Sequence, residues 1–328
     1  MKDSFDDILL KANLVKKNFE TEELIHTVED IKKNLLNLFP HIIESNKIDL
    51  KHNNGFLVDL ETINSLIKNF KEEKVFGTVS ESKKSEDKKI MYGKQIMDKG
   101  TGIIINDGNT YVIIELLLKN ILAGNSIIFV NKGFLYGTNS FMIKIVQDIL
   151  EVNHIDKNLV QLYITEDYDE VLRNYANIDF VIGVGDRRLQ QEVLEKSKNP
   201  TIVSGYENFN LYLEEKKDIE FINTILKETP NINLYIKEGI GLDHPKAMLV
   251  ADIEEAIAQI NYTGSNYASS IITNNPENSR KFVSEIKSSI VTVNTSPTIE
   301  RVIDIKQEDL VIEKTIITPL NFETKKEN

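Results

Sequence analysis

The feature that most limits the fold of this chain is a regular alternation of short apolar runs and amphipathic segments between residues 101 and 204. The expected strands are 101–106, 126–131, 159–164, 178–184 and 200–204, and the expected helices are 110–123, 138–152, 167–176 and 186–198. Short apolar strands without polar alternation, each followed by a helix, indicate a parallel sheet that is covered on both faces. We therefore expect a doubly wound α/β domain of Rossmann-like type, which binds ligands beyond the carboxyl ends of its strands.

The segments on either side of this alternation suggest further parts of the chain. Amphipathic helices are expected before residue 70, and the charged segment 72–100 is expected to be an exposed linker with a hairpin at 88–97. After residue 205 a looser alternation of strands and helices predicts a second, smaller α/β domain. The expected parts are 1–205 with a hairpin arm at 80–100, then 206–300, and then 301–328 with a strand that lacks a partner nearby in the sequence.

Composition excludes several classes of site and partner. The formal net charge of −12 repels phosphate backbones, so nucleic acid and anionic membranes are not expected as partners. The chain has no cysteine, which excludes disulfides, cysteine-ligated metals and thiol catalysis. Five scattered histidines show no metal-binding spacing, so we expect no metal site. The charged N-terminus resembles no signal peptide and no apolar run is long enough to span a membrane, so the expected location is the cytoplasm.

Two expected strands end in residues that suit a nucleotide. Asn131 and Lys132 follow one strand, and Gly183 and Gly185 end another, each just before a helix. Backbone N–H groups at a helix N-terminus attract phosphate, and a lysine there adds positive charge. Glycine in a tight turn needs no ligand, however, and Asp186 places a carboxylate where phosphate would lie. Nucleotide binding and a purely structural role both stay open.

A polar bend joins an expected helix and an expected strand between residues 260 and 268. It contains Tyr262, Gly264 and Ser265, which are small or form hydrogen bonds. Such residues commonly satisfy the end of a helix. They are also suited to binding a substrate, and the bend alone does not decide between the two interpretations.

The bend and the segment after it carry a resemblance to a known family. Residues 254–299, "EEAIAQINYTGSNYASSIITNNPENSRKFVSEIKSSIVTVNTSPTI", resemble the corresponding segment of the γ-glutamyl phosphate reductases, also called glutamate-5-semialdehyde dehydrogenases. Residues 101–133 are similar to the nucleotide-domain strand and helix of that family, and Gly124 and Asn125 match especially well. The resemblance covers most of the chain. It implies an aldehyde dehydrogenase-like fold, with a nucleotide domain for NAD(P), a catalytic domain and an oligomerisation arm formed by 80–100 and the C-terminal strand.

The chain departs from this family at the position of its catalytic cysteine, whose thiolate attacks the substrate carbonyl. By the resemblance, the segment "KETPNINLYI" places Ile232 at the expected position of that nucleophile and Asn233 beside it. Asn109 matches an asparagine of the family, although the arginine and proline that precede it are absent. By the resemblance, Asn109, Asn233, Tyr262, Gly264 and Ser265 belong to the substrate side, and no catalytic residue remains.

Three hypotheses follow for the function. The first is a pseudoenzyme: a dimeric homo-oligomer that binds NAD(P) weakly or not at all and acts as a binding or regulatory partner of an active homologue. The second is an NAD(P)-dependent oxidoreductase that acts on an aldehyde or acyl phosphate without a thiol. The third is a small-molecule or nucleotide sensor. The sequence names neither a substrate nor a physiological partner.

Overall fold

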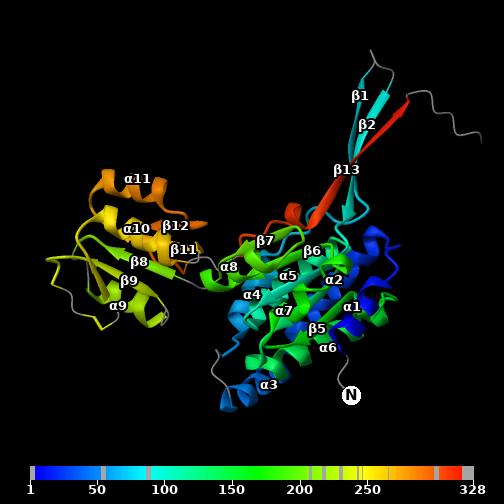
Figure 1. Ribbon diagram of the computed structural model, residues 1–328, viewed down its shortest axis with the longest axis horizontal. Helices are drawn as coiled ribbons and strands as arrows, with labels where there is room; N and C mark the ends of the chain where they lie inside the picture. Colours follow the sequence, from blue (N-terminus) through cyan, green and yellow to red (C-terminus); the bar gives the residue numbers. More distant parts are fainter. Residues whose placement is uncertain are drawn as a thin grey trace, which may run out of the picture. The chain divides into compact units, whose positions relative to one another are not determined.

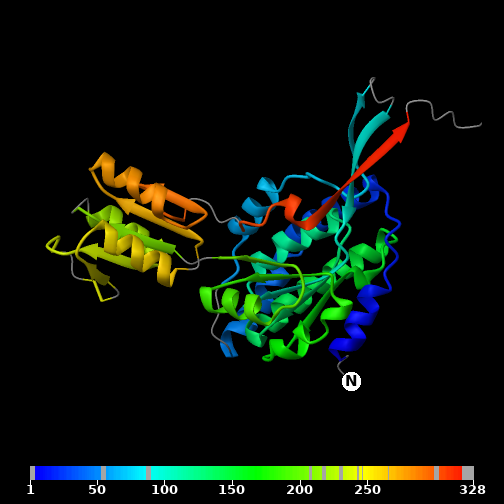
Figure 2. The same ribbon diagram turned by 45° about the horizontal axis from the view of Figure 1, so that its top comes forward.

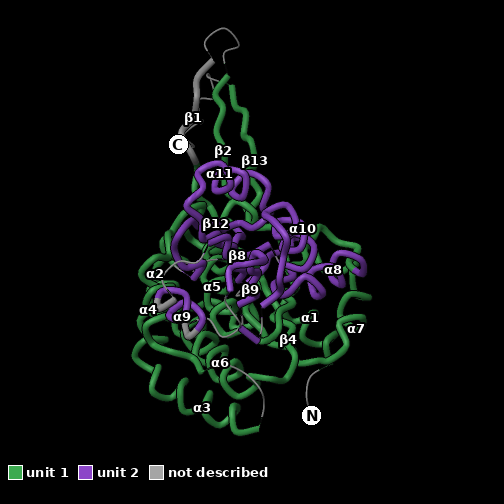
Figure 3. The backbone as a smooth tube through the Cα atoms, turned by 90° about the vertical axis from the view of Figure 1, so that its left-hand side faces the viewer, with its two compact units in different colours: residues 1–182, 197–201, 306–328 green, residues 183–196, 202–305 purple. Residues whose placement is uncertain are grey.

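The structure is a computed structural model that describes residues 4–52, 57–85, 90–206, 209–215, 219–228, 232–241, 244–245, 247–264, 266–298 and 303–319. The chain forms two compact units, drawn in separate colours in Figure 3. Unit 1 comprises residues 1–182, 197–201 and 306–328, and unit 2 comprises residues 183–196 and 202–305. We describe each unit by itself.

The first five-stranded sheet has β3 at its centre, with the strand order β5-β4-β3-β6-β7 (Figure 1). Its strands are β3 (Thr101–Asn106), β4 (Ser126–Asn131), β5 (Val160–Ile164), β6 (Phe180–Val184) and β7 (Thr201–Ser204). The pairs β3–β4 and β4–β5 are parallel. Every residue of β3 and β4 is buried, which explains why these strands carry no polar alternation. The order, with later strands added on both sides of β3, confirms the expected doubly wound α/β fold.

Helices join these strands, and most of the sequence predictions for them are correct to within a few residues. They are α5 (Thr110–Leu122), α6 (Tyr136–Val152), α7 (Tyr168–Leu172) and α8 (Arg187–Lys196), with short 3₁₀ turns η1 (Gly133–Leu135), η2 (Lys157–Leu159) and η3 (Tyr175–Asn177). The expected helix at 167–176 is shorter, because α7 ends at Leu172. After α5, Gly124 has a φ of 73°, a left-handed conformation that glycine adopts without strain and that ends the helix.

Four helices precede the sheet in the sequence. They are α1 (Phe5–Asn13), α2 (Thr21–Asn37), α3 (Phe39–His52) and α4 (Leu60–Asn69). Helix α1 packs against β4 and β5, whereas α2 and α3 pack against α6. Leu24, Val28, Ile31 and Leu35 of α2 are fully buried, as their helical spacing predicts.

A separate three-stranded antiparallel sheet, which we call the arm sheet, has the order β1-β2-β13. Its strands are β1 (Val79–Ser85), β2 (Ile90–Asp98) and β13 (Val311–Pro319), the last of which follows η4 (Gln307–Leu310). Strand β13 lies beside β2 along its whole length, from Val311 opposite Asp98 to Pro319 opposite Ile90 (Figure 2). The hairpin expected at 88–97 is wrong: residues 90–98 form one strand, and its neighbours are β1 and the distant β13.

Unit 2 contains a parallel sheet with the order β10-β9-β8-β11-β12. Its strands are β8 (Phe209–Leu213), β9 (Asn233–Lys237), β10 (Ala247–Val250), β11 (Ala268–Ile272) and β12 (Ile290–Val293), and its further helices are α9 (Ile219–Glu228), α10 (Ile253–Thr263) and α11 (Pro276–Glu285). Tyr212 and Tyr235 of the sheet pack with Phe282 of α11 in a fully buried core that also includes α10. Apolar side chains on these two helices thus cover one face of the sheet.

The hydropathy of the helices bears on membrane insertion. Among the residues that the structure describes, no helix combines the length and the apolar character that crossing a bilayer requires.

Candidate functional site

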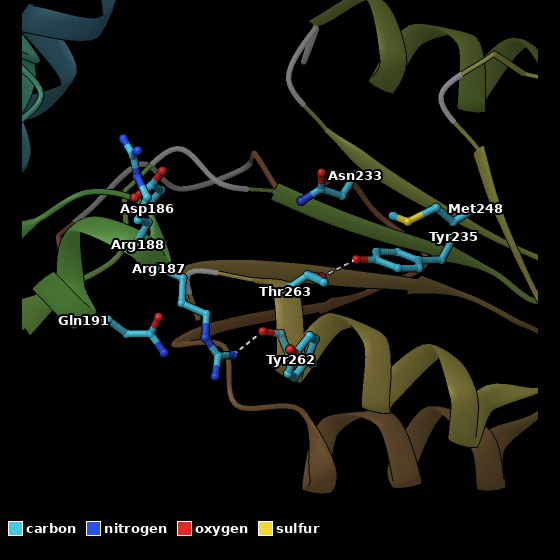
Figure 4. A pocket seen from close by; sticks show the side chains of 9 residues that line it. All are labelled: Asp186, Arg187, Arg188, Gln191, Asn233, Tyr235, Met248, Tyr262 and Thr263. Carbon is cyan, nitrogen blue, oxygen red and sulfur yellow. Dashed lines mark hydrogen bonds between the residues drawn. The ribbon is translucent and has the colours of Figure 1, made fainter.

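Unit 2 contains a pocket with a volume of about 620 Å³. Figure 4 shows the side chains that line it, which come from the start of α8, from β9 and β10, and from the end of α10. The lining residues are Asp186, Arg187, Arg188, Gln191, Asn233, Tyr235, Met248, Tyr262 and Thr263. The lining therefore combines polar groups with the aromatic rings of Tyr235 and Tyr262 and the thioether of Met248. Such a mixture is typical of small-molecule sites.

Arg187 ties α8 to the C-terminal end of α10. Its Nη1 donates to the carbonyl oxygen of Asn261 at 2.7 Å and to that of Tyr262, and its guanidinium lies over the Tyr262 ring at 5.5 Å. The last carbonyls of a helix have no partner within the helix and carry partial negative charge, so a cation stabilises them.

The hydroxyl groups at the end of α10 are also satisfied by the chain itself. Thr263 donates its Oγ1 hydrogen to the carbonyl of Gln259 at 2.7 Å, and the same oxygen lies 2.9 Å from the Tyr235 hydroxyl. Burial raises the pKa of Tyr235, against the opposing effect of the Thr263 hydrogen bond. The phenol therefore stays neutral at physiological pH and is a poor nucleophile.

A row of polar side chains leads from the pocket across the amino ends of the strands of unit 2. Asn233 donates to Asn210 Oδ1 at 3.0 Å, Asn210 donates to Ser269 Oγ at 3.2 Å, and Ser269 lies 2.6 Å from the Ser288 hydroxyl. Asn210 and Ser269 are fully buried, and each is in register with its neighbour. The network fixes the orientation of the Asn233 amide at the edge of the pocket.

The structure brings together part of the predicted substrate side. Asn233 and Tyr262 line the same pocket, and Gly264 follows directly as the C-cap of α10, where its N–H donates to the carbonyl of Ile260 at 2.8 Å. Ile232, at the predicted nucleophile position, is a buried apolar residue beside Asn233. Ser265 lies outside the described residues. The polar bend thus supplies hydrogen bonds that the C-terminal end of α10 needs, and the same end of α10 lines the pocket.

The remaining predicted positions before residue 183 belong to unit 1. Asn109 is the N-cap of α5, and its Oδ1 accepts from the N–H groups of Tyr111 and Val112. Asn131 is fully buried at the end of β4, and neither of its side-chain polar atoms has a hydrogen-bond partner in the described structure. Lys132 is half-buried, with its Nζ 5.5 Å from the centre of the Tyr168 ring.

The two glycines at the end of β6 have local packing roles. A Cβ on residue 183 would lie 3.2 Å from the Val193 side chain, so Gly183 allows α8 to lie close to its strand. Gly185 donates its N–H to the carbonyl of Ser204 at 3.1 Å. Asp186 then caps α8, because its Oδ1 accepts from the N–H of Leu189 at 2.8 Å.

At the start of α8, the groups that could contact a phosphate already have partners within the chain. The carboxylate of Asp186 already occupies the N-terminal N–H group of Leu189, and Arg187 is engaged at the end of α10. A dinucleotide phosphate that binds here would have to displace the carboxylate of Asp186 from the N–H of Leu189 and draw Arg187 away from α10. The negative charge of Asp186 would also repel the phosphate.

Within the described residues no three His, Asp or Glu side chains are grouped in a way that could hold a metal ion.

The curated proteins to which the chain is similar include several γ-glutamyl phosphate reductases. The chain is 24% identical over 262 residues to γ-glutamyl phosphate reductase of Petrotoga mobilis, a match that covers 63% of each chain. It is 22% identical over 355 residues to the enzyme of the same name from Dictyoglomus thermophilum, which covers 87% of this chain and 84% of the relative. The match thus spans less than two thirds of the length of the first relative and more of the second. No protein-family model matches the chain.

Comparisons with solved structures confirm the fold. γ-Glutamyl phosphate reductase from Thermotoga maritima superposes with a TM-score of 0.66 at 18% identity, covering 96% of this chain and 98% of the other. Glyceraldehyde-3-phosphate dehydrogenase from Methanocaldococcus jannaschii, solved in complex with NADP, has a TM-score of 0.71 at 14% identity and covers 96% and 94%. The chain therefore has the aldehyde dehydrogenase fold, and the resemblance to γ-glutamyl phosphate reductases found in the sequence is confirmed.

Proposed function

We propose that this chain is a catalytically inactive protein of the aldehyde dehydrogenase fold that serves as a binding or regulatory partner, with an active homologue as its partner. One observation carries the proposal: its 328 residues contain no cysteine, and Ile232 occupies the expected position of the nucleophile. A thiolate is both a strong nucleophile and a good leaving group, and an isoleucine side chain can do neither task.

No other group in the pocket replaces the thiol. The Thr263 hydroxyl is engaged with Gln259 and Tyr235, and the Tyr235 phenol is held neutral by burial. A hydroxyl nucleophile needs an adjacent general base. Asp186, the pocket's one carboxylate among the described lining residues, instead accepts from the N–H of Leu189.

The rest of the proposal concerns the ligands and the setting of this protein. NAD(P) binds weakly or not at all, because Asp186 repels phosphate at the start of α8 and Arg187 is engaged elsewhere. The protein acts in the cytoplasm as a homo-oligomer, most simply a dimer, assembled through the arm sheet. Nucleic acid and membranes are not partners, in line with the net charge of −12.

A small-molecule sensor is the second candidate, and the pocket itself favours it. Its volume of about 620 Å³ lies within the usual range of ligand sites, roughly 300–1,000 Å³. Arg188 and Gln191 line it from the exposed face of α8 and offer donors to an anionic or polar ligand. Like the first candidate, a sensor would not turn over a substrate. It differs from the first candidate because it would bind a soluble small molecule.

Steady-state kinetics with glutamate-5-semialdehyde, simple aldehydes and both coenzymes tests the first candidate. Loss of a catalytic nucleophile typically lowers turnover on the order of 10⁶-fold, so we expect no NAD(P)-dependent oxidation above the background rate. Two variants are informative companions: Ile232→Cys places a thiol at the expected position of the nucleophile, and Asn233→Cys places one in the lining of the pocket. Clear turnover by the unmodified chain, reproducible between preparations, would refute the proposal and favour the thiol-free oxidoreductase.

A further inference from the structure

Unit 1 contains a pocket of its own, which we call the β5 pocket, with a volume of about 690 Å³. Its lining comes from Ser4 and Ile8 at the start of α1, from residues 161–164 of β5, and from one face of α6. Both helices pack against β5, as can be followed in Figure 1. The function proposed above makes no use of this pocket.

Strand β5 is an edge strand, because its one neighbour in the described sheet is β4. The N–H of Thr165 donates to the carbonyl oxygen of Asn131 at 3.1 Å, and Asn131 is in register with Ile164. In a parallel pair, a residue bonds the two residues that flank its register partner, so the backbone groups of Tyr163 and Thr165 face β4. The backbone N–H and C=O groups of Leu162 and Ile164 therefore face away from β4.

The β5 pocket lies along this outer edge and is not confined to one face of the sheet. Successive side chains of a strand point to opposite faces, so residues 161–164 alternate between the two faces. All four residues line the pocket, which therefore borders the edge of the strand. Helix α1 closes one side, since the Gln161 amide donates to the carbonyl of Ile8 at 2.9 Å. The outward backbone groups of Leu162 and Ile164 thus face the pocket.

The length of the pocket fits a short extended segment. Its α6 lining extends from Tyr136 to Gln147, about three helical turns or roughly 16 Å. An extended chain rises about 3.3 Å per residue, so about five residues fill this length. At the start of the strand, the carbonyl of Val160 is already bonded by the Gln147 amide at 2.9 Å, which marks one end of the open edge.

The chemistry of the lining favours an uncharged ligand that is rich in hydrogen-bonding groups. In the described structure the side chains that line the pocket are those of serine, tyrosine, glutamine, leucine and isoleucine, and none of them is charged. A peptide backbone supplies N–H and C=O groups at the spacing of a strand, and peptides that add to a sheet edge bind through these groups. The aliphatic side chains of the lining suit small or apolar side chains of such a peptide.

The surroundings of Tyr163 give one part of the pocket a negative charge. The Tyr163 hydroxyl donates to the Glu170 carboxylate at 3.1 Å. Burial, this hydrogen bond, and the negative charges of Glu170 and Asp6 raise the pKa of Tyr163. Two carboxylates thus act on this hydroxyl, and charge complementarity favours a lysine or arginine on a segment that binds beside it.

We propose that the β5 pocket binds an extended peptide segment of a partner protein, about five residues long, which adds to the sheet of unit 1 beside β5. Its backbone pairs with Leu162 and Ile164, its small or apolar side chains contact α1 and α6, and a lysine or arginine lies near Tyr163. The inference goes beyond the proposed function, because it identifies a second binding site and the chemistry of its ligand. It depends neither on the absence of turnover nor on the pocket of unit 2.

The probes for the test are short peptides selected from a random library on phage against the immobilised full chain, then synthesised with blocked ends. Binding is measured by fluorescence anisotropy. Leu162→Pro removes one outward N–H at an edge position, where proline is tolerated, and Ser140→Trp fills the pocket from α6. Val152→Trp is the matched control, because Val152 is 75% exposed on the same helix and does not line the pocket.

The unmodified chain and Val152→Trp should enrich the same basic peptides and bind them equally. Leu162→Pro and Ser140→Trp should each weaken binding at least about tenfold, because the first loses a main-chain hydrogen bond to the peptide and the second loses the space for it. Methylation of alternate peptide N–H groups should weaken binding by a similar factor. Hydrogen exchange of the Leu162 and Ile164 amides should slow when peptide binds.

Three results would overturn the proposal. The first is a library from which the unmodified chain enriches no peptide. The second is a set of peptides that bind the folded variants as tightly as the unmodified chain, and Ser140→Trp decides this if Leu162→Pro does not fold. The third is a sedimentation coefficient that falls in Leu162→Pro without peptide, which would show that the edge of β5 pairs with a second copy of the chain.

Discussion

Arg187 is the residue whose role is clearest at the scale of single side chains. It bonds two terminal carbonyls of α10 and stacks on Tyr262, so its removal leaves the helix end without a counter-charge. Hydrogen bonds to charged groups contribute about 1.5–3 kcal/mol each when buried, and Arg187 is half-buried. We expect Arg187→Ala to lower the free energy of unfolding by about 2 kcal/mol, measured by urea denaturation.

The neighbouring arginine provides the matched control for this prediction. Arg188 is exposed, and Arg188→Ala should change the free energy of unfolding by no more than about 0.5 kcal/mol. Arg187→Lys keeps the charge but loses the planar donor fork, so its stability should lie between the two. Equal effects of the two alanine substitutions would show that the contact with α10 contributes little.

At the scale of elements, Glu313 adds ion pairs to the backbone pairing that holds strand β13 to the rest of unit 1. Its carboxylate bonds Lys74 and, at 2.8 Å, Lys94 of β2, and these cations, Lys74 foremost, lower the pKa of Glu313 to about 2. A carboxyl with a depressed pKa stabilises the fold fully above its unfolded pKa of about 4.3 and loses this contribution as pH falls through the folded pKa. We therefore expect β13 to detach more easily between about pH 4.5 and pH 2.

Hydrogen–deuterium exchange of residues 311–319, corrected for intrinsic rates, measures this effect. Protection in the unmodified chain should fall over that pH window, whereas Glu313→Gln should be less protected already at pH 5 and change little below it. Glu151→Gln breaks the surface pair with Lys157 elsewhere in unit 1 and should leave β13 unaffected. An unchanged pH profile in Glu313→Gln would assign the pH response to other groups.

The elements also show what local sequence patterns can and cannot predict. Strands β3 and β4 were predictable because their apolar runs are buried on both sides, and the start of α5 because Asn109 precedes it. The association of β13 with β2 was expected only from the family resemblance, which implies an arm formed by 80–100 and the C-terminal strand. Local patterns do not predict it, because more than 200 residues separate the two strands and neither encodes its partner.

The candidate site was predictable only in part, for the same reason. Asn233 and Tyr262 were found through the family resemblance, but their pocket neighbours Arg187 and Met248 come from elements whose proximity the sequence does not reveal. Likewise, no local signal in the sequence predicts that the carboxylate of Asp49 in α3 accepts from the N–H of Gly137 in α6. A glycine in the first turn of a helix, where propensity disfavours it, was the available hint of a close approach.

At the scale of the whole molecule, the arm sheet leaves two edges without a partner strand in the described chain, on β1 and on β13. Ile312 and Ile317 on β13 are 50% and 57% exposed, and Val79 on β1 is 62% exposed. A long, partly apolar edge strand favours pairing with another chain, and stable proteins cover such edges. We therefore expect the purified protein to be a dimer or larger assembly at micromolar concentration, held together through the arm sheet.

Sedimentation velocity over a range of concentrations tests this assembly. Ile312→Lys with Ile317→Lys should convert the protein to a monomer with an unchanged far-ultraviolet spectrum, because charge on both faces of β13 opposes burial in an interface. Val152→Lys is the control: Val152 is 75% exposed at the end of α6, and its replacement should leave the assembly intact. A monomer in the unmodified protein would contradict the prediction. An assembly that survives the double substitution would place the interface on another surface and leave the arm sheet without the role that its exposed edges suggest.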